Sequence, residues 1–169
     1  MKYAESNERW RARVADIWQK ATGEGDEVEV FLAINRLVQM RSADDPVAIF
    51  ELASAYDYSG QDIKAEQFYR TALALGLDEQ RRARAVLQLA SSLRNLQRPL
   101  ESVALLRAEL ADIKDPALRA AGAAFLSLAL LDCACPAQAA EAALAGLVPF
   151  LSDYKVSLAR YVNQLAEHG

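Results

Sequence analysis

A block of residues recurs three times along this chain of 169 residues, and the recurrence limits the fold more than any other feature. Residues 52–56 read LASAY, and related stretches follow at residues 89–93 and 126–130. Each copy is displaced from the previous one by 37 positions. Self-similarity with a period of roughly 20 to 50 residues indicates that one supersecondary unit is stacked several times, because a single unit does not bury its own apolar face.

Each copy is predicted to be a pair of α-helices joined by a short break. Apolar residues within a copy lie three or four positions apart, as at Phe50, Ala53 and Tyr56, and this spacing is helical. A break follows each first helix, and the same point after it is occupied by Asp62, Pro99 and Pro136. Proline suits the first turn of a helix, and a carboxylate favours a helix N-terminus. The second helices should therefore run over residues 62–75, 99–111 and 136–151, and no strand pattern is visible.

Two flanking segments complete the helical pattern. Between residues 4 and 22, apolar side chains that include Trp10, Val14 and Trp18 form one stripe. Residues 26–40 are predicted to form a partner helix whose apolar positions are Val30, Leu32, Ile34, Leu37 and Val38. A final amphipathic helix over residues 153–167 should bury Leu158, Tyr161, Val162 and Leu165. A stack needs such ends because its terminal units otherwise expose a core face.

The first copy resembles the tetratricopeptide repeat (TPR) family, whose helix–turn–helix unit of 34 residues places bulky and small residues at fixed offsets. This sequence supplies those positions with Ile49, Leu52, Ala53, Tyr56, Gly60, Ala65, Tyr69 and Ala72. The longer period here is attributed to first helices that begin early in the second and third copies, near Asp78 and Pro116. More narrowly, residues 88–96 and 101–102 look like a small bacterial stand-alone repeat family of no established biochemistry.

The resemblance implies an all-α fold, a right-handed superhelical stack of antiparallel helix pairs of the TPR-like α–α solenoid type. We expect a single domain over residues 1–169, with about three repeats between an N-terminal helix pair and a C-terminal capping helix. The expected segments are a degenerate pair over 4–41, repeats over 46–76, 78–111 and 116–151, and a capping helix over 153–168. Small residues such as Ala53 and Ala65 then allow helices to cross at about 8–10 Å.

Composition and charge disfavour several classes of partner. The formal net charge of −4 argues against nonspecific binding to a nucleic-acid backbone. The longest uncharged run, residues 120–131, is shorter than the roughly 20 residues that cross a bilayer. No apolar core of a secretory signal is visible at the start, and Cys133 and Cys135 are too poorly placed to pair. We therefore expect a bacterial cytoplasmic protein with reduced thiols and with neither nucleic-acid nor membrane partners.

Catalytic and metal-binding patterns are not recognisable in the sequence. The single histidine, His168, is the penultimate residue, and no nucleophile elbow, phosphate loop or paired metal motif occurs. Cys133 and Cys135 together with one histidine supply too few ligands for a zinc site. We predict that the protein is not an enzyme and that it holds neither a metal nor a cofactor.

In the resembled family, the first helix of each repeat lines a concave face that holds the ligand. Carried over to this sequence, the candidate positions are Phe50, Ser54, Asp57, Tyr58, Arg84, Gln88, Ser91, Arg94 and Asn95. Four of these follow helical spacing in the second copy and form one polar stripe, Arg84, Gln88, Ser91 and Asn95. A guanidinium and a carboxamide on one wall can hold a peptide backbone or a carboxylate. Alternatively, the stripe is simply solvated, or Arg84 and Arg94 pair with Glu51 and Asp57.

The third copy offers a surface of a different kind. Its corresponding positions include Ala124, Leu128 and Leu131, which would form an apolar patch on the same face. Such patches usually mark an interface. The chain's own last helix, an amphipathic helix of a partner, or a second copy of the protein could cover it.

The resemblance therefore implies a protein–protein interaction module or scaffold that binds a protein or peptide partner through the concave face of its repeats. One alternative is a homodimer that self-associates through the apolar third repeat and the C-terminal helix. A less favoured alternative is a sensor of a small peptide or ligand, which would need a deep, closed pocket. The carboxylate clamp of some family members is not intact here, because its lysine and asparagine positions hold Phe50, Ser54, Arg84 and Gln88.

Overall fold

The computed structural model describes the backbone of residues 6–168 and the side chains of residues 6–165. Nine α-helices and two short 3₁₀ segments make up this part of the chain, and it contains no strand. The helices are α1 (Asn7–Lys20), α2 (Glu27–Val38), α3 (Pro46–Tyr58), α4 (Asp62–Leu75), α5 (Glu79–Asn95), α6 (Pro99–Glu109), α7 (Pro116–Asp132), α8 (Pro136–Leu147) and α9 (Lys155–His168). The prediction of an all-α fold is confirmed.

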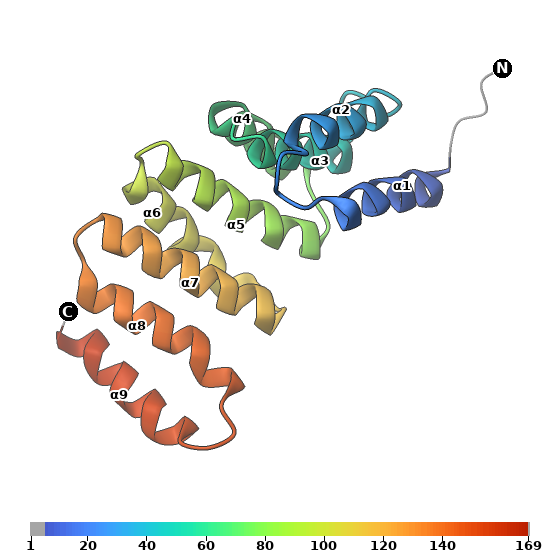
Figure 1. Ribbon diagram of the computed structural model, residues 1–169. Helices are drawn as coiled ribbons and strands as arrows, with labels where there is room; N and C mark the ends of the chain where they lie inside the picture. Colours follow the sequence, from blue (N-terminus) through green and yellow to red (C-terminus); the bar gives the residue numbers. More distant parts are fainter. Residues whose placement is uncertain (1–5, 169) are drawn as a thin grey trace. The chain divides into compact units, whose positions relative to one another are not determined.

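The chain forms two compact units, residues 1–77 and 78–169. Unit 1 contains α1 to α4, and unit 2 contains α5 to α9 (Figure 1). Within each unit, consecutive helices pack against one another, as α3 does on α4, α5 on α6, and α7 on α8. The 3₁₀ segments Leu110–Asp112 and Val148–Phe150 extend α6 and α8. The expected division of residues 1–169 into one domain and named repeats stays a prediction.

An aspartate caps the first helix of every repeat. The carboxylates of Asp45, Asp78 and Asp115 accept backbone N–H groups in the first turns of α3, α5 and α7, at 2.8–3.0 Å for the shortest bond of each. Asp78 and Asp115 are 37 residues apart, whereas Asp45 lies only 33 residues before Asp78. As a result α5 and α7 each have 17 residues and α3 has 13. The early starts expected near Asp78 and Pro116 are confirmed.

The break within each helix pair closes in the same way in all three repeats. A backbone N–H donates to the carbonyl five residues earlier, at 2.9 Å in each of the pairs Gln61–Tyr56, Arg98–Leu93 and Cys135–Leu130. This is the Schellman arrangement that ends helices with a left-handed residue. That residue is Gly60, Gln97 or Ala134, with φ of 71°, 60° and 57°. The 37-residue period is therefore preserved in the backbone even where glycine is absent.

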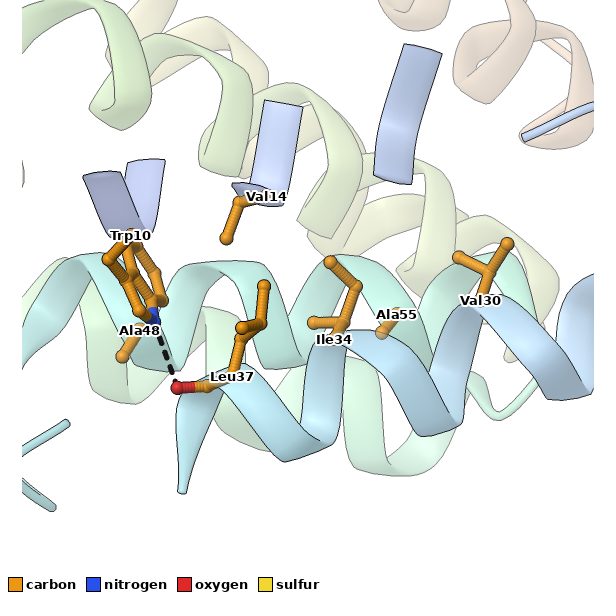
Figure 2. Close-up of a cluster of buried hydrophobic side chains, with 7 residues drawn as sticks. All are labelled: Trp10, Val14, Val30, Ile34, Leu37, Ala48 and Ala55. Carbon is orange, nitrogen blue, oxygen red and sulfur yellow. Dashed lines mark hydrogen bonds between the residues drawn. The ribbon is translucent and has the colours of Figure 1, made fainter. Parts of the chain in front are cut away.

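The core of unit 1 is built around Trp10. Figure 2 shows Trp10 and Val14 of α1 above Val30, Ile34 and Leu37 of α2, with Ala48 and Ala55 of α3 behind them. The indole Nε1–H of Trp10 donates to the Leu37 carbonyl at 2.8 Å. Because the buried N–H is satisfied, the indole contributes its full apolar surface to the core. The apolar stripe predicted for the first helix is thus a packing surface.

Small residues bring α3 and α4 together in the second half of unit 1. Ala53, Ala65 and Ala72 are completely buried, and the family-like Tyr69 lies among them. The ring of Tyr69 is 6.2 Å from that of Phe50, and Tyr56 stacks on Phe68 at 5.3 Å. The aromatic rings fill the space that the close-packed alanines leave beside the helix crossing.

Unit 2 has an aliphatic core. Leu89, Leu93 and Leu106 are buried between α5 and α6, and the buried Ser102 donates to the Ala90 carbonyl at 2.8 Å. Further along, Val103 of α6 packs with Ala129, Leu130 and Ala139 of α7 and α8. The helices α7 and α8 approach closely at Gly146, where an added Cβ would lie 2.8 Å from the Cβ of Ala123. The helix α9 packs on α8 and buries Val162.

Two residues that were expected to point inward, Tyr161 and Leu165, are exposed instead, and so is the apolar Leu32 of α2. In α2, the buried residues Val30, Ile34 and Leu37 define the inner face, and Leu32 lies on the opposite one. In α9, Val162 is buried, whereas Tyr161 and Leu165 are exposed because α9 packs on α8 and the segment after it. The apolar residues were correctly identified, but their faces depend on which side carries a neighbour.

Candidate partner-binding surface

In unit 1, two predicted contact residues lie inside the helix pair. Phe50 and Ser54 are only 6% and 7% exposed. The Ser54 hydroxyl donates to the Phe50 carbonyl at 3.1 Å, and its Oγ lies 3.4 Å from the hydroxyl oxygen of Tyr69. Burial leaves these two side chains little surface to offer a partner, so we leave them out of the proposed site.

The other two predicted residues of unit 1, Asp57 and Tyr58, are half-buried and already engaged. The Tyr69 hydroxyl donates to Asp57 Oδ2 at 3.1 Å. Burial, reinforced by the nearby Asp57 carboxylate, raises the pKa of Tyr69, so the phenol stays protonated and remains a donor. The hydrogen bond between Tyr69 and Asp57 therefore stabilises the inside of unit 1.

Tyr58 fastens the loop between α1 and α2 to the end of α3. Its hydroxyl donates to Asp26 Oδ1 at 2.7 Å and accepts the backbone N–H of Gly23. The other carboxylate oxygen of Asp26 accepts the backbone N–H of Thr22 at 2.8 Å. Hydrogen bonds from Thr22 and Tyr58 lower the pKa of Asp26, and the bond to that carboxylate raises the pKa of Tyr58. Tyr58 thus serves as a tether.

In unit 2, the polar stripe lies along the outward side of α5. Residues on the other sides of the helix, such as Val86, Leu89 and Leu93, are buried. Arg84 and Asn95 are exposed, and Gln88 and Ser91 between them are half-buried. The burial pattern agrees with the helical spacing by which the stripe was predicted, although its role as a binding surface stays a prediction.

Two members of the stripe differ from their neighbours in their hydrogen bonding. Arg84 makes no ion pair or side-chain hydrogen bond with the residues that the structure describes. The side-chain oxygen Oε1 of Gln88 is buried and accepts no hydrogen bond from them. Nearby cations on the same helix are paired, because Arg81 contacts Asp78 and Arg82 contacts Glu109, each at 2.6 Å. Within the described part of the chain, the charge of Arg84 is therefore uncompensated.

An ion pair joins the C-terminal ends of α5 and α7. Arg94 Nε lies 2.7 Å from Asp132 Oδ2, with both side chains partly exposed. The helices run side by side in the same unit (Figure 1). The sequence left open a pairing of Arg94 with Glu51 or Asp57. In the structure Arg94 instead pairs with Asp132, which lies 38 positions further along the chain.

Beside the polar stripe, α7 presents apolar side chains. Ala124 is exposed, and Leu128 and Leu131 are 43% and 53% exposed. By the 37-residue period, Leu128 corresponds to Ser91 and Leu131 to Arg94, so these residues occupy the same register on neighbouring helices. The C-terminal helix does not cover them, because it packs on α8 and leaves both leucines accessible. We call this surface the α5/α7 face and define it by Arg84, Gln88, Ser91, Arg94, Ala124, Leu128, Leu131 and Asp132.

Two buried polar features were not foreseen from the sequence. The indole of Trp18 donates to Glu51 Oε2 at 2.7 Å, which ties α1 to α3. The buried oxygen of Gln88 is the other. Glutamate and glutamine at such helical positions are ordinarily solvated, and no local pattern distinguishes the buried ones.

Two properties of residues 6–168 concern metal ions and membranes. No group of three or more histidine, cysteine, aspartate or glutamate side chains in the described part is arranged to hold a metal ion. None of the described helices combines the length and the apolar character needed to span a membrane.

Capped helix pairs with a common left-handed turn define an all-α repeat protein. The family model for the tetratrico peptide repeat matches residues 46–165, so the chain belongs to the tetratrico peptide repeat family. No curated protein matches the chain. Repeats of this family generally mediate protein–protein interaction and are in general non-enzymatic scaffolds.

Proposed function

We propose that the protein is an interaction module of the bacterial cytoplasm that binds a protein or peptide partner through the first helices of its repeats. The observation that carries the proposal is the α5/α7 face, where Leu128 and Leu131 stay accessible and Arg84 makes no ion pair with the described residues. Exposed apolar side chains rimmed by polar groups typically mark an interaction site.

The test compares partners captured by the full chain and by a variant of this face. We expect Leu128→Ser/Leu131→Ser to lose the captured proteins, because serine removes the apolar contact without disturbing the core. Leu100→Ser is the matched control, since Leu100 is 74% exposed on α6. Quantitative mass spectrometry of the captured proteins and circular dichroism of each variant are the measurements. Equal capture by the folded double variant and the wild type would contradict the proposal.

A second candidate is a homodimer that forms through the apolar third repeat and the C-terminal helix. It is favoured by apolar side chains at the end of unit 2, where Phe150 is 55% exposed and Val156 is 84% exposed. Burial of such residues against a second copy would remove apolar surface from water. Light scattering after size exclusion distinguishes 18.5 kDa from twice that mass. A strict monomer at tens of micromolar removes this candidate.

A further inference from the structure

We infer that Cys133 and Cys135 are a site of reversible thiol oxidation, where a low-molecular-weight disulfide such as oxidised glutathione links the two sulfurs across the turn between α7 and α8. In the structure both thiols are free and half-buried. The pair lies wholly within unit 2, and its chemistry is independent of the partner proposed above.

The two cysteines end one helix and begin the next. Cys133 is the C-cap of α7, Cys135 is the N-cap of α8, and Ala134 between them is left-handed with φ of 57°. Two residues apart on one helix, side chains point to different sides, and on that basis the sequence predicted no pairing. Residues that flank a single left-handed residue have Cα atoms about 5.4 Å apart. Disulfides usually span about 4.4–6.8 Å between Cα atoms, so the backbone separation suits a bond.

The equivalent turn of unit 1 shows that side chains at these two positions meet. Two periods of 37 residues relate Cys133 to Ser59 and Cys135 to Gln61. Both turns close with the same backbone hydrogen bond, at 2.9 Å in each. In unit 1, Gln61 Nε2 donates to Ser59 Oγ at 3.0 Å. The turn therefore directs the two flanking side chains toward each other.

The thiol of Cys135 already lies over the turn. It donates to the backbone carbonyl of Cys133, with Sγ 3.5 Å from the oxygen. Both cysteine side chains pack against the buried cluster that α6, α7 and α8 share. Because the backbone separation suits a disulfide, rotation of the two side chains is the main change that brings the sulfurs together.

The oxidation proceeds by two thiol–disulfide exchanges. The thiolate of one cysteine attacks a sulfur of oxidised glutathione, whose S–S bond breaks, so that a mixed disulfide forms and one glutathione thiolate leaves. The thiolate of the other cysteine then attacks the protein sulfur of the mixed disulfide, which forms the bond between Cys133 and Cys135 and releases the second glutathione. The protein loses two electrons and two protons, and the two glutathione molecules take them up.

A disulfide at this turn is suited to reversible oxidation rather than to stabilising the fold. Disulfides stabilise a protein chiefly by restricting the unfolded chain, and a loop with one residue between the cysteines gains little. A ring this short also strains the bond, and strained disulfides are readily reduced. The state of the pair should therefore follow the ratio of oxidised to reduced glutathione around the protein.

The full, folded chain is equilibrated with mixtures of oxidised and reduced glutathione, alkylated with iodoacetamide and measured by intact mass spectrometry. As the share of oxidised glutathione rises, we expect the wild type to lose two hydrogen atoms and both alkylation sites. Dithiothreitol should restore both thiols. Cys133→Ser and Cys135→Ser should each stop at a mixed disulfide that carries one glutathione, because the thiol that would displace it is missing.

The role of the turn is tested by moving the pair in a chain whose two native cysteines are replaced by serine. Ser59→Cys/Gln61→Cys places the pair on the equivalent turn of unit 1 and should again lose two hydrogen atoms. Ala143→Cys/Ala145→Cys is the matched control, with two exposed positions at the same spacing inside α8. It should take up two glutathiones and form no ring. Circular dichroism confirms that each variant is folded.

Four results would overturn the inference. The wild type could keep both thiols open to alkylation at every glutathione ratio, or it could stop at mixed disulfides. The new bond could join two chains, which a non-reducing gel reveals. The control pair inside α8 could close as readily as the native pair, and the turn would then have no part in the reaction.

Discussion

The two units use the same helix–turn–helix backbone and fill it with different side chains. Unit 1 is packed with aromatic residues, and all four ring pairs in the described part of the chain lie there, including Phe50 with Tyr69 and Tyr56 with Phe68. Unit 2 is packed with leucine, valine and alanine, and two glycines lie inside its helices, Gly122 in α7 and Gly146 in α8. Three of its four aromatic residues, Phe150, Tyr154 and Tyr161, are exposed, and Phe125 is half-buried.

This difference predicts which kind of substitution destabilises each unit. An aromatic core fails when a large side chain is removed, because a cavity remains. Close helix packing over small residues fails when a side chain grows, because the backbones must separate. Unit 1 should therefore be the more sensitive to truncation, and unit 2 should be notably sensitive to enlargement.

The largest expected effect is that of Trp10→Ala in unit 1. Trp10 is 2% exposed, and its removal leaves a large cavity and deletes the hydrogen bond from its indole to the Leu37 carbonyl. We expect a loss of about 3–5 kcal/mol in the free energy of unfolding. Urea denaturation followed by circular dichroism measures it. Trp10→Phe, which keeps a ring, should lose less, and a loss below about 1 kcal/mol for alanine would break the comparison.

Enlargement is tested in unit 2 with Gly146→Ala. The new Cβ would lie 2.8 Å from Ala123 Cβ and 3.4 Å from the Ala120 carbonyl oxygen. Alanine is the better helix former by roughly 1 kcal/mol, yet we expect a net loss of about 1–3 kcal/mol because α7 and α8 must move apart. Combining it with Ala123→Gly should recover part of that loss in a double-mutant cycle. A Gly146→Ala variant more stable than the wild type would contradict the steric argument.

Much of the fold could be predicted because the repeat carries its own backbone signals. Pro99 and Pro136 mark helix starts, and Gly60 marks the left-handed turn that Gln97 and Ala134 share. These signals are local, since they depend on one residue's φ or its missing N–H. A helix start or a turn recognised in one copy therefore predicts the same feature 37 residues further along, even when the residue type changes.

The candidate site could be predicted only in part. Helical spacing correctly placed Arg84, Gln88, Ser91 and Asn95 on one side of α5, because geometry within one helix is local. Burial of Phe50 and Ser54, and the pairing of Arg94 with Asp132, depend on neighbouring helices. Spacing along a single helix contains no information about those neighbours.

A smaller effect is expected at the turns, where the units also differ. Unit 1 has Gly60 at its left-handed position, whereas unit 2 holds Gln97 and Ala134 at φ of 60° and 57°. A side chain is disfavoured there by roughly 1–2 kcal/mol. Ala134→Gly should relieve this strain, but glycine also raises the conformational entropy of the unfolded chain. We therefore expect a net rise of about 0.5–1 kcal/mol in the free energy of unfolding. Ala137→Gly in the first turn of α8 should instead lower it. Thermal denaturation measures both, and a destabilised Ala134→Gly would show that the turn is not strained.

The smallest effect concerns acid, and it is expected in unit 1. Hydrogen bonds from Thr22 and Tyr58 lower the pKa of Asp26 below its ordinary value of 3.8. A carboxylate with a depressed folded pKa stabilises the fold above its unfolded pKa, and that contribution is lost as pH falls through the folded pKa. Asp26→Asn should therefore be less stable than the wild type at pH 7, and the difference should shrink below about pH 4.

Both tryptophans, Trp10 and Trp18, lie in unit 1, so their fluorescence during urea denaturation at pH 7 and pH 3 reports the relevant transition. Asp153→Asn in unit 2 is the control and should leave that transition unchanged at both pH values. If Asp26→Asn and the wild type differed equally at pH 7 and pH 3, the carboxylate would not be what fastens the α1–α2 loop to Tyr58.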